Sequence, residues 1–418
     1  MPVALPKIVL NLLHSRSVKG KSTALARSSP GQVVPRVAAY PGHRNDDGSA
    51  NKLGPRMGKF AEACCKIGPT MAVTMKDIAR DLGIAVITVS KVMRNKDDVS
   101  DETRKRVLDR VKEVNYTPNL AARALVTGRS NLIGLVVPDL LHTFFAEIAK
   151  SLSNALLKKD YHLIIAISDE NPELESRTVN RLLGRKLDAL IIASACTTSE
   201  MFKGIQHHGP PLVLIDRRFP DLDTNYVGAD DEMIGVLAAE HLIEIGCKRI
   251  AHLRGPETSA GIGRLNGYRK ALAKHRMKPL PGYVFAPETV DVHSTETGAE
   301  LTKRLLALNP RPDGIFAYND PMAIGAIEAI LDAGLRVPED VAVIGSGNLY
   351  YDARLRIPLS SIDQQTEQIG ERTARLTLSL LGLKTRPRNK AVIIQPQLVI
   401  RASTDRKLTK RRGLRGRG

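Results

Sequence analysis

The sequence predicts an α/β protein in which a small helical domain precedes a two-lobed domain with parallel sheets. Residues 74–116 show only helix-like spacing of apolar residues, whereas from Leu132 short apolar runs alternate with amphipathic segments. This alternation is typical of βαβ units and parallel sheets. The chain of 418 residues is too long for one ordinary domain. Because the alternation exceeds what one doubly wound sheet uses, we expect two similar lobes with a cleft between them.

The first helical segment has start and stop signals for three short helices. Thr74 begins a T-x-x-D start and Gly83 ends the first helix. The second helix is predicted over residues 86–93, with one apolar side and the other positions facing out. Ser100 opens a third helix, which ends before Pro118. The apolar positions expected in the common core are Ile78, Ala79, Leu82, Val89, Val92, Met93, Val107, Val111 and Val114.

From Leu132 onward, predicted strands alternate with predicted helices. Strands are expected at 132–138, 162–167, 188–194, 211–216, 249–255, 313–318 and 341–345. Helices are expected at 144–159, in a segment ending near Gly184, and at 238–245, 268–275 and 323–333.

The ends of the chain lack this patterning and carry much of its net charge of +18. Residues 1–70 and the tail 404–418 have no periodic apolar positions, so we interpret both as disordered extensions. The basic excess fits a polyanionic partner, although many basic chains never bind nucleic acid. Two interpretations of residues 1–70 remain open. Either Met71 is the true start of translation, or the segment is a genuine disordered arm.

The cysteines and the apolar runs predict a cytoplasmic, soluble protein without a metal site or other cofactor. The chain contains no CxxC motif and no nearby histidine at metal-ligand spacing. The apolar stretch Leu5–Leu13 is short and is interrupted by Lys7, so we do not interpret it as a secretory signal. No run approaches the ~18 apolar residues of a membrane span. The four cysteines are Cys64, Cys65, Cys196 and Cys247.

Two helices joined by a tight glycine turn match a helix-turn-helix, in which the second helix enters the DNA major groove. The string TMKDIARDLGIAVITVSKVMRNKDDVSDETRKRVLDRVKEVNYTPNLAARAL closely resembles the DNA-binding region of the lac/gal repressor family, and the resemblance covers nearly all of residues 74–403. It implies a helix-turn-helix headpiece at 74–117, a hinge helix and linker at 118–130, and a two-lobed, periplasmic-binding-protein-like effector domain at 131–403. It also implies a homodimer on a pseudo-palindromic DNA operator.

The resemblance assigns DNA contacts to the second helix. It places Thr88 and Ser90 at operator phosphates, and Val86, Ile87 and Lys91 at base edges. Lys91 can donate to guanine O6 and N7, and a branched apolar side chain can contact a thymine methyl group. The alternative for Val86, Ile87 and Lys91 is packing within the headpiece.

Two residues of the headpiece depart from the family pattern. Ala85 stands where a serine usually caps the second helix, which removes a cap worth ~1 kcal/mol and one phosphate contact. Arg94 stands where an asparagine usually ends that helix. Both departures put the usual operator sequence in doubt.

The segment from Pro118 to Leu125 resembles the family's hinge helix, which orders on DNA and inserts a leucine into the minor groove. The resemblance implies DNA contacts for Asn119, Ala122 and Leu125. Small alanines permit close approach of two such helices, and Leu125 is an apolar wedge. The alternative is a plain linker helix.

The resemblance also implies an effector site at the carboxyl ends of the strands, where ligands collect in open α/β sheets. A set of carboxylate, guanidinium and amide groups suits a polyol, so the predicted effector is sugar-like. His293 stands where an aromatic ring often stacks on the ligand, and it is either a ligand contact or structural. Gly345–Gly347 lacks a carboxylate that usually binds ligand hydroxyls. The other positions assigned to the effector are Asp139, Phe144, Phe145, Asp216, Arg264, Asn319 and Asp320.

Two other classes of protein compete with a transcription regulator. A solute-binding transport protein would share the two lobes but would have a signal peptide and no helix-turn-helix. A nucleotide-dependent oxidoreductase would need a phosphate-binding glycine turn, and the glycines between Gly261 and Gly267 lack the fingerprint spacing. No Ser/His/Asp set indicates catalysis. The sequence therefore predicts a non-enzymatic, effector-controlled DNA-binding regulator, a repressor of carbohydrate-related genes.

Overall fold

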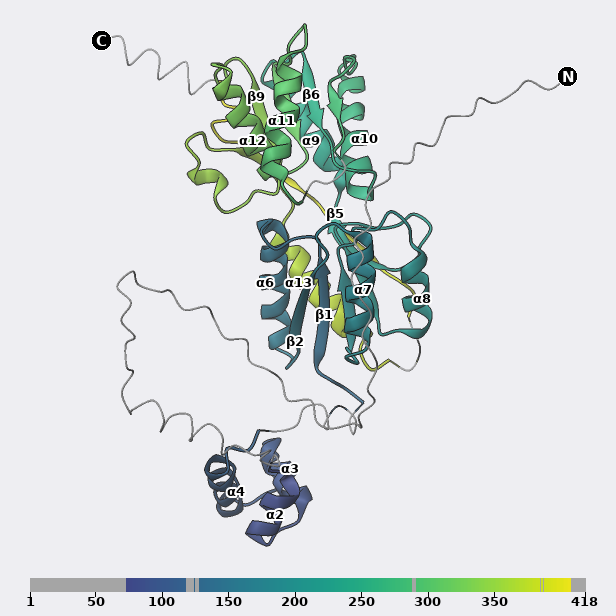
Figure 1. Cartoon of the computed structure of the whole chain (residues 1–418), viewed down its shortest axis with the longest axis vertical. Helices are drawn as coiled ribbons and strands as arrows, with labels where there is room; N and C mark the ends of the chain where they lie inside the picture. The colour runs from purple at the N-terminus through teal and green to yellow at the C-terminus, as the bar shows by residue number, and fades with distance from the viewer. Residues whose placement is uncertain are drawn as a thin grey trace, which may run out of the picture. The chain divides into compact units, whose positions relative to one another are not determined.

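The computed structural model describes residues 73–117, 124, 128–287, 291–383, 385 and 387–406. Its first part is the headpiece, a small bundle of helices (Figure 1). The core of the headpiece is formed by Ile78, Ala79, Val89, Val92 and Val107, all of which are buried. The helices of the headpiece are α2 (Met75–Leu82), α3 (Val86–Met93) and α4 (Asp101–Glu113).

Local sequence explains where these helices begin and end. Thr74 and Asp77 form the reciprocal hydrogen bonds of a capping box at the start of α2. Gly83 ends α2 in the left-handed conformation with φ 67°, which glycine adopts without strain. The side chain of Ser100 accepts a hydrogen bond from the backbone of Thr103 at the start of α4. The start and stop signals predicted for α2 and α4 are therefore confirmed.

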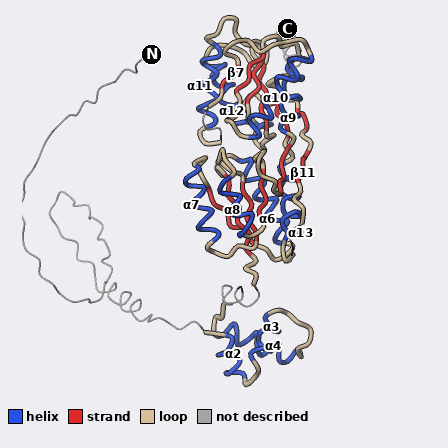
Figure 2. Tube along the Cα trace, turned by 90° about the vertical axis from the view of Figure 1, so that its right-hand side faces the viewer, coloured by secondary structure: helices blue, strands red, loops and turns tan. Residues whose placement is uncertain are grey.

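The rest of the described chain forms two lobes, each with a parallel sheet covered by helices on both faces (Figure 2). The N-lobe sheet has the strand order β2-β1-β3-β4-β5-β11. Its elements are β1 (Leu132–Val137), α6 (Thr143–Leu157), β2 (His162–Ile167), α7 (Pro172–Leu183), β3 (Ala189–Ile192), α8 (Glu200–His208), β4 (Leu212–Ile215), β5 (Asn225–Ala229), α13 (Thr366–Leu380) and β11 (Ala391–Ile394).

The C-lobe repeats this arrangement with the order β7-β6-β8-β9-β10-β12, in which β12 pairs antiparallel with β10. Its elements are α9 (Asp231–Glu244), β6 (Ile250–Leu253), α10 (Ser259–Lys274), β7 (Val284–Phe285), α11 (Ser294–Leu306), β8 (Gly314–Ala317), α12 (Asp320–Asp332), β9 (Ala342–Ser346), the 3-10 helix η1 (Asp352–Arg354), β10 (Ser360–Asp363) and β12 (Gln397–Val399).

Each sheet is buried by helices on both faces, which explains why its central strands read as continuous apolar runs. In the N-lobe, α6 and α13 cover one face and α7 and α8 the other. In the C-lobe, α9 and α10 cover one face and α11 and α12 the other. The predicted fold class, a headpiece followed by two parallel-sheet lobes, is confirmed.

The chain passes between the lobes three times. It enters the C-lobe after β5, returns with α13 and β11, and crosses back to β12. The strands at the end of the chain, β10, β11 and β12, have no prediction from sequence. They are short, and β11 pairs with β5, which lies far away along the chain.

The glycines between Gly261 and Gly267 lie inside α10 and have a packing role. A side chain at Gly267 would meet the backbone oxygen of Glu232 in α9, and one at Gly235 would meet the backbone of α10. These glycines let α9 and α10 approach closely, which agrees with rejecting them as a nucleotide-binding loop. Helix α10 begins at Ser259, nine residues before the predicted start at Tyr268, because this glycine-rich turn carries no apolar periodicity.

Candidate functional sites

Helix α3 presents apolar residues on the surface of the headpiece. Val86 and Ile87 at its start are 40% and 63% exposed, whereas Val89 and Val92 on its opposite side are buried. Solvent-facing branched residues contribute little to the core. The structure therefore places Val86 and Ile87 on an accessible face of the second helix rather than in the headpiece interior.

The polar residues predicted on the same helix lie around this face. Thr88 and Ser90 are half-buried. The Nζ atom of Lys91 lies 2.5 Å from Oδ2 of Asp98, in a pair whose side chains are 37% and 58% exposed. The hydrogen bond from Lys91 lowers the pKa of Asp98. Exposed pairs of this kind are weak, so a DNA base or phosphate can displace Asp98 from Lys91.

The two family departures in α3 have local consequences. Ala85 makes no side-chain hydrogen bond at the start of the helix. At the other end, Nε of Arg94 donates to the backbone oxygen of Ser90 at 3.1 Å. Arg94 therefore satisfies a carbonyl of the last turn, which is a role that the sequence comparison did not suggest.

The second site lies between the two lobes, at the carboxyl ends of the strands. Asp216 follows β4, Asn319 follows β8, and Gln364 follows β10. The cavity between the lining side chains has a volume of about 10 Å³. The cavity is lined by His142, Phe144, Phe145, Asp216, Arg264, Asp291, Tyr318, Asn319 and Gln364.

Five of the predicted effector residues therefore meet at one place, namely Phe144, Phe145, Asp216, Arg264 and Asn319. They come from segments that are far apart in the sequence. The remaining four lining residues were not predicted. Tyr318 ends a predicted strand and His142 comes two residues before a predicted helix, so both lie close to sequence signals. Gln364 follows β10, which was not predicted, and Asp291 lies outside every predicted element.

Arg264 is held in place by the C-lobe. Its guanidinium donates from Nε to Asp231 at 3.1 Å, from Nη1 to the backbone oxygen of Tyr318 at 2.6 Å, and from Nη2 to Gln364 at 3.0 Å. It also lies 4.2 Å from the centre of the Tyr318 ring. Burial raises the pKa of Asp231 to about 6, and the charge of Arg264 opposes this shift.

His142 is a cleft residue that sequence reasoning missed. It is 6% exposed and comes just before α6. Neither ring nitrogen has a hydrogen-bond partner within the described part of the chain. Burial lowers the pKa of His142 to about 4, so the imidazole is neutral at neutral pH. A neutral imidazole offers one donor and one acceptor to a bound molecule.

Three predicted effector residues lie outside this cavity lining, namely Asp139, His293 and Asp320. The carboxylate of Asp139 accepts a hydrogen bond from the backbone of Leu141 at 3.0 Å. His293 is exposed and occupies the position before α11 with φ 56°. Its backbone conformation, rather than a ring contact, is the feature that the structure shows at this position.

Asp320 is fully buried beside the cavity rather than in its lining. Its carboxylate accepts hydrogen bonds from Ser361 Oγ at 2.6 Å and from the backbone of Leu349 at 3.3 Å. The carboxyl group of Asp352 lies beside it, and burial, together with the charge of Asp320, raises the pKa of Asp352 to about 9. The raised pKa favours the protonated form of Asp352 at neutral pH. The hydrogen bonds from Leu349 and Ser361 hold their segment against Asp320 at the start of α12.

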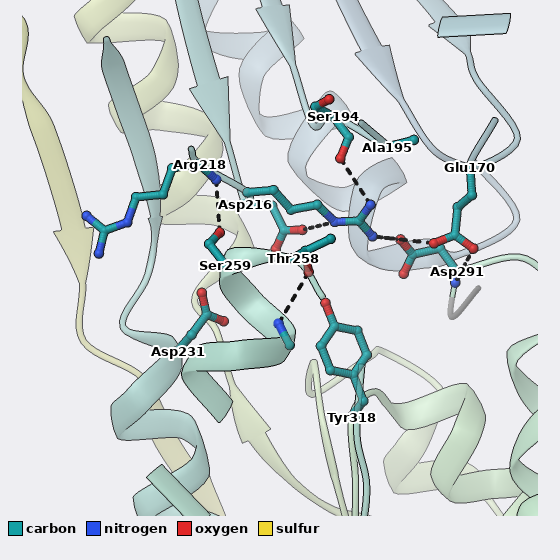
Figure 3. A network of polar contacts seen from close by, with 12 residues as sticks. Glu170, Ser194, Ala195, Asp216, Arg218, Asp231, Thr258, Ser259, Asp291 and Tyr318 are labelled. Atoms are coloured by element: carbon teal, nitrogen blue, oxygen red, sulfur yellow. Dashed lines mark hydrogen bonds and ion pairs between the residues drawn. The ribbon is translucent and has the colours of Figure 1, made fainter. Parts of the chain in front are cut away.

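A buried ion network crosses from one lobe to the other next to the cavity (Figure 3). Arg217 lies two residues after the end of β4 and is 3% exposed. Its guanidinium pairs with Asp291 of the C-lobe and with Glu170 and Asp216 of the N-lobe. One cation is therefore surrounded by carboxylates from both walls of the cleft.

Other predictions lie outside the described residues. These are the hinge contacts Asn119, Ala122 and Leu125, the extension 1–70, and most of the tail 404–418. Among the described residues, no group of histidine, cysteine and carboxylate side chains is arranged to hold a metal ion. Within the same residues, no helix is long and apolar enough to cross a membrane.

Comparison with protein families gives two matches that follow the domain order. Residues 74–119 match the family "Bacterial regulatory proteins, lacI family", and residues 239–404 match the "Periplasmic binding protein-like domain". The first match covers the helices α2, α3 and α4, and the second covers most of the C-lobe and the returning segments.

The chain is also similar to whole regulators. It is 30% identical to the HTH-type transcriptional regulator DegA of Bacillus subtilis over 80% of this chain and 98% of that protein. It is 31% identical to the HTH-type transcriptional repressor PurR of Mannheimia succiniciproducens, over 79% of this chain and 98% of that protein. The ribose operon repressor of Halalkalibacterium halodurans is 30% identical to this chain, over 74% of this chain and 91% of that protein.

Two solved structures share the architecture. The transcriptional regulator CelR–cellobiose complex matches with a TM-score of 0.60 and 28% identity, over 79% of this chain and 99% of that one. The lac repressor dimer bound to operator and the anti-inducer ONPF matches with a TM-score of 0.70 and 25% identity, over the same shares. Together with the helix-turn-helix and the two lobes, these similarities show that the chain belongs to the LacI family of bacterial regulatory proteins and is a DNA-binding transcription regulator.

Proposed function

We propose that this protein is a homodimeric repressor of carbohydrate-related genes, released or strengthened by a sugar-like effector that binds between its lobes. The observation that carries the proposal is the cavity lining. A carboxylate (Asp216), an amide (Asn319) and a neutral imidazole (His142) face apolar rings in one inter-lobe site. Directed donors and acceptors on a largely apolar wall suit a polyhydroxylated molecule.

The names of similar proteins support this class of effector. One similar structure is a complex with cellobiose, and one relative is a ribose operon repressor. The cleft of this chain uses its own set of groups, because the segment Gly345–Gly347 carries no carboxylate. The effector is therefore assigned here as a chemical class and not as one sugar.

The DNA side of the proposal rests on the exposed face of α3. In this proposal, Val86, Ile87 and Lys91 contact base edges in the major groove. Thr88 and Ser90 contact phosphates of the operator. The similar lac repressor structure is a dimer on its operator. A two-fold protein with one recognition helix per protomer reads a two-fold site, so we expect a pseudo-palindromic operator. The hinge residues Asn119, Ala122 and Leu125 complete the contact in the minor groove.

Genome-wide occupancy mapping of the full chain tests the DNA part and supplies the operator. We expect sites with two half-sites, footprints that cover both, and an affinity that falls steeply with salt. Protection of a single half-site, or an affinity independent of salt, would contradict a dimer on a palindrome. The genes next to the sites then define the sugars to be screened.

Asp216→Asn tests the effector part. The substitution keeps the shape of the side chain, and asparagine tolerates the left-handed conformation of Asp216, with φ 61°. It removes a charged acceptor, so we expect calorimetry to show about tenfold weaker binding of the identified effector or more. Operator affinity without effector should change little.

Asp139→Asn is the matched control, because Asp139 was assigned to the effector from sequence but does not line the cavity. We expect its effector affinity to equal that of the wild type. Unchanged effector affinity in Asp216→Asn would remove the inter-lobe cavity from the proposal.

A further inference from the structure

The ion network beside the effector cavity contains more negative than positive charge. The single guanidinium of Arg217 faces three carboxylates, those of Glu170, Asp216 and Asp291. All four side chains are 8% exposed or less. Water therefore screens this charge little, and the interactions are stronger than on a surface.

The carboxylates come from different lobes. Glu170 follows β2 and Asp216 follows β4, so both belong to the N-lobe, as does Arg217. Asp291 precedes α11 and belongs to the C-lobe. Closing the cleft thus brings one further negative charge against two that the N-lobe already holds. In a buried place, like charges repel strongly unless a cation lies between them.

Arg217 has the geometry of that cation. Its Nη1 donates to the backbone oxygen of Ser194 at 3.1 Å, which fixes the guanidinium within the N-lobe. Its Nη2 donates to Asp291 across the cleft and lies 3.6 Å from Glu170 Oε1. Its Nε lies 3.5 Å from Asp216 Oδ2. A planar guanidinium can serve all these partners at once, whereas a single ammonium group cannot.

The ionisation of the carboxyl groups agrees with this picture. Burial raises the pKa of Asp291 to about 6, and the charge of Arg217 is the largest effect that opposes the shift. Burial also raises the pKa of Glu170, and Asp291 raises it further. The closed arrangement is therefore costly for the carboxylates, and the guanidinium offsets that cost.

Other contacts between the lobes form at the same seam. Glu170 Oε2 accepts hydrogen bonds from the backbone nitrogens of Asp291 at 3.0 Å and Val292 at 3.2 Å. The backbone nitrogen of Arg218 donates to Ser259 Oγ at 2.9 Å (Figure 3). These bonds require the two walls to lie within hydrogen-bond distance, so they depend on the charge balance at Arg217.

We propose that Arg217 is the central cation of an inter-lobe latch that keeps the effector cleft closed without help from the effector. Arg217 is a positioning residue, because it acts through Asp291 and the two N-lobe carboxylates. The consequence of the latch for regulation rests on the proposed function. An effector must enter while the latch is open, so the measured affinity for the effector includes the free-energy cost of opening the latch.

The test measures lobe closure in the full chain without added effector. One spin label is attached at Arg181→Cys on α7 and one at Lys303→Cys on α11, both exposed positions, in a background without native cysteines. Pulsed electron resonance then gives the distribution of distances between the lobes. In Arg217→Met we expect the ratio of closed to open molecules to fall about tenfold or more, because three buried carboxylates lose the cation that pairs with all of them.

Arg218→Met is the matched control. It makes the same chemical change one residue later, at an exposed side chain, and keeps the backbone donor to Ser259. We expect the wild-type distribution. Asp291→Asn should also remain closed, because it lowers the negative surplus and keeps a group that can contact Arg217. This asymmetry between Arg217→Met and Asp291→Asn separates a central cation from a simple salt bridge.

Two results would overturn the proposal. One is a wild-type distribution in Arg217→Met, and the other is opening in Asp291→Asn as large as in Arg217→Met. If Arg217→Met does not fold, Arg217→Lys replaces it, and we expect a second, longer distance because an ammonium cannot hold Ser194 and Asp291 together. A distribution equal to wild type in Arg217→Lys would then count against the latch. Failure of the latch is distinguishable from failure of the proposed function, because lobe distances are measured without effector and the test of the proposed function is effector binding itself.

Discussion

At the scale of residues, α3 is divided between packing and recognition. Val89 and Val92 are buried in the headpiece, while Val86 and Ile87 face solvent. Lys91 lies between these two sets and is paired with Asp98. Because that pair is exposed and weak, a guanine acceptor can replace Asp98 as the partner of the Lys91 ammonium group.

Lys91→Ala should relax base preference. Loss of a base-edge donor costs ~1–3 kcal/mol at the preferred site and little on other sequences. Binding of wild type and variant to a randomised DNA pool, followed by sequencing, measures the preference at each position. Lys96→Ala removes a nearby exposed lysine outside α3 and should lower affinity evenly across sequences, if at all. If both variants lost affinity by the same factor for every DNA sequence, base reading by Lys91 would be excluded.

At the scale of elements, the carboxyl pair of Asp320 and Asp352 joins the start of α12 to the segment that leads into β10. Leu349 in this segment packs into the N-lobe core, although Asp320 belongs to the C-lobe. Both carboxyl groups are fully buried. The raised pKa of Asp352 therefore belongs to a buried segment that contacts both lobes.

This pair predicts how stability depends on pH. The pKa of Asp352 is raised to about 9 in the folded protein, above its value in the unfolded chain. The folded state therefore holds a proton that the unfolded state releases, and the free energy of unfolding falls as pH rises through this window. The slope for one such group is about 1.4 kcal/mol per pH unit. In Asp352→Asn, which has no proton to release, the slope between about pH 6 and pH 8 should be flatter.

Urea unfolding at several pH values measures these slopes. Asp332→Asn at the exposed end of α12 is the control and should keep the wild-type slope. An unchanged slope in Asp352→Asn would mean that Asp352 does not hold a proton in the folded protein.

At the scale of the whole molecule, three crossings of the chain tie the lobes together. A change in lobe closure therefore moves several connections at once, and β1 of the N-lobe follows the segment 118–130 in the sequence. Effector and operator binding should be coupled reciprocally. If the effector changes the affinity for operator by some factor, the operator must change the affinity for effector by the same factor.

Leu125→Ala tests the link through the hinge. Loss of an apolar wedge from the minor groove should weaken operator binding while binding to random DNA stays the same, because no phosphate contact is lost. The ratio of the two affinities at one salt concentration measures the effect. Val126→Ala, which shortens the next apolar side chain, should keep the wild-type ratio. A fall in both affinities by the same factor would exclude the wedge.

Much of the architecture could be predicted from the sequence because its signals are local. Thr74, Gly83 and Ser100 mark helix ends through bonds to their immediate neighbours. Apolar runs predict the central strands of both sheets, because these strands are buried on both faces. Family resemblance then identified five residues of the cavity.

The arrangement of side chains between the lobes follows from the tertiary fold. His142, Asp291, Tyr318 and Gln364 join the cavity because the chain crosses the lobes three times, and no local pattern records such contacts. Asp320, which resembled a ligand residue, is instead paired with Asp352, 32 positions later in the printed sequence. The headpiece helices, the central strands, their order and the class of regulator could be predicted from the sequence, since these depend on neighbours along the chain and on resemblance. The charge balance around Arg217 depends on burial and on distances between separate segments, which arise only in the folded molecule.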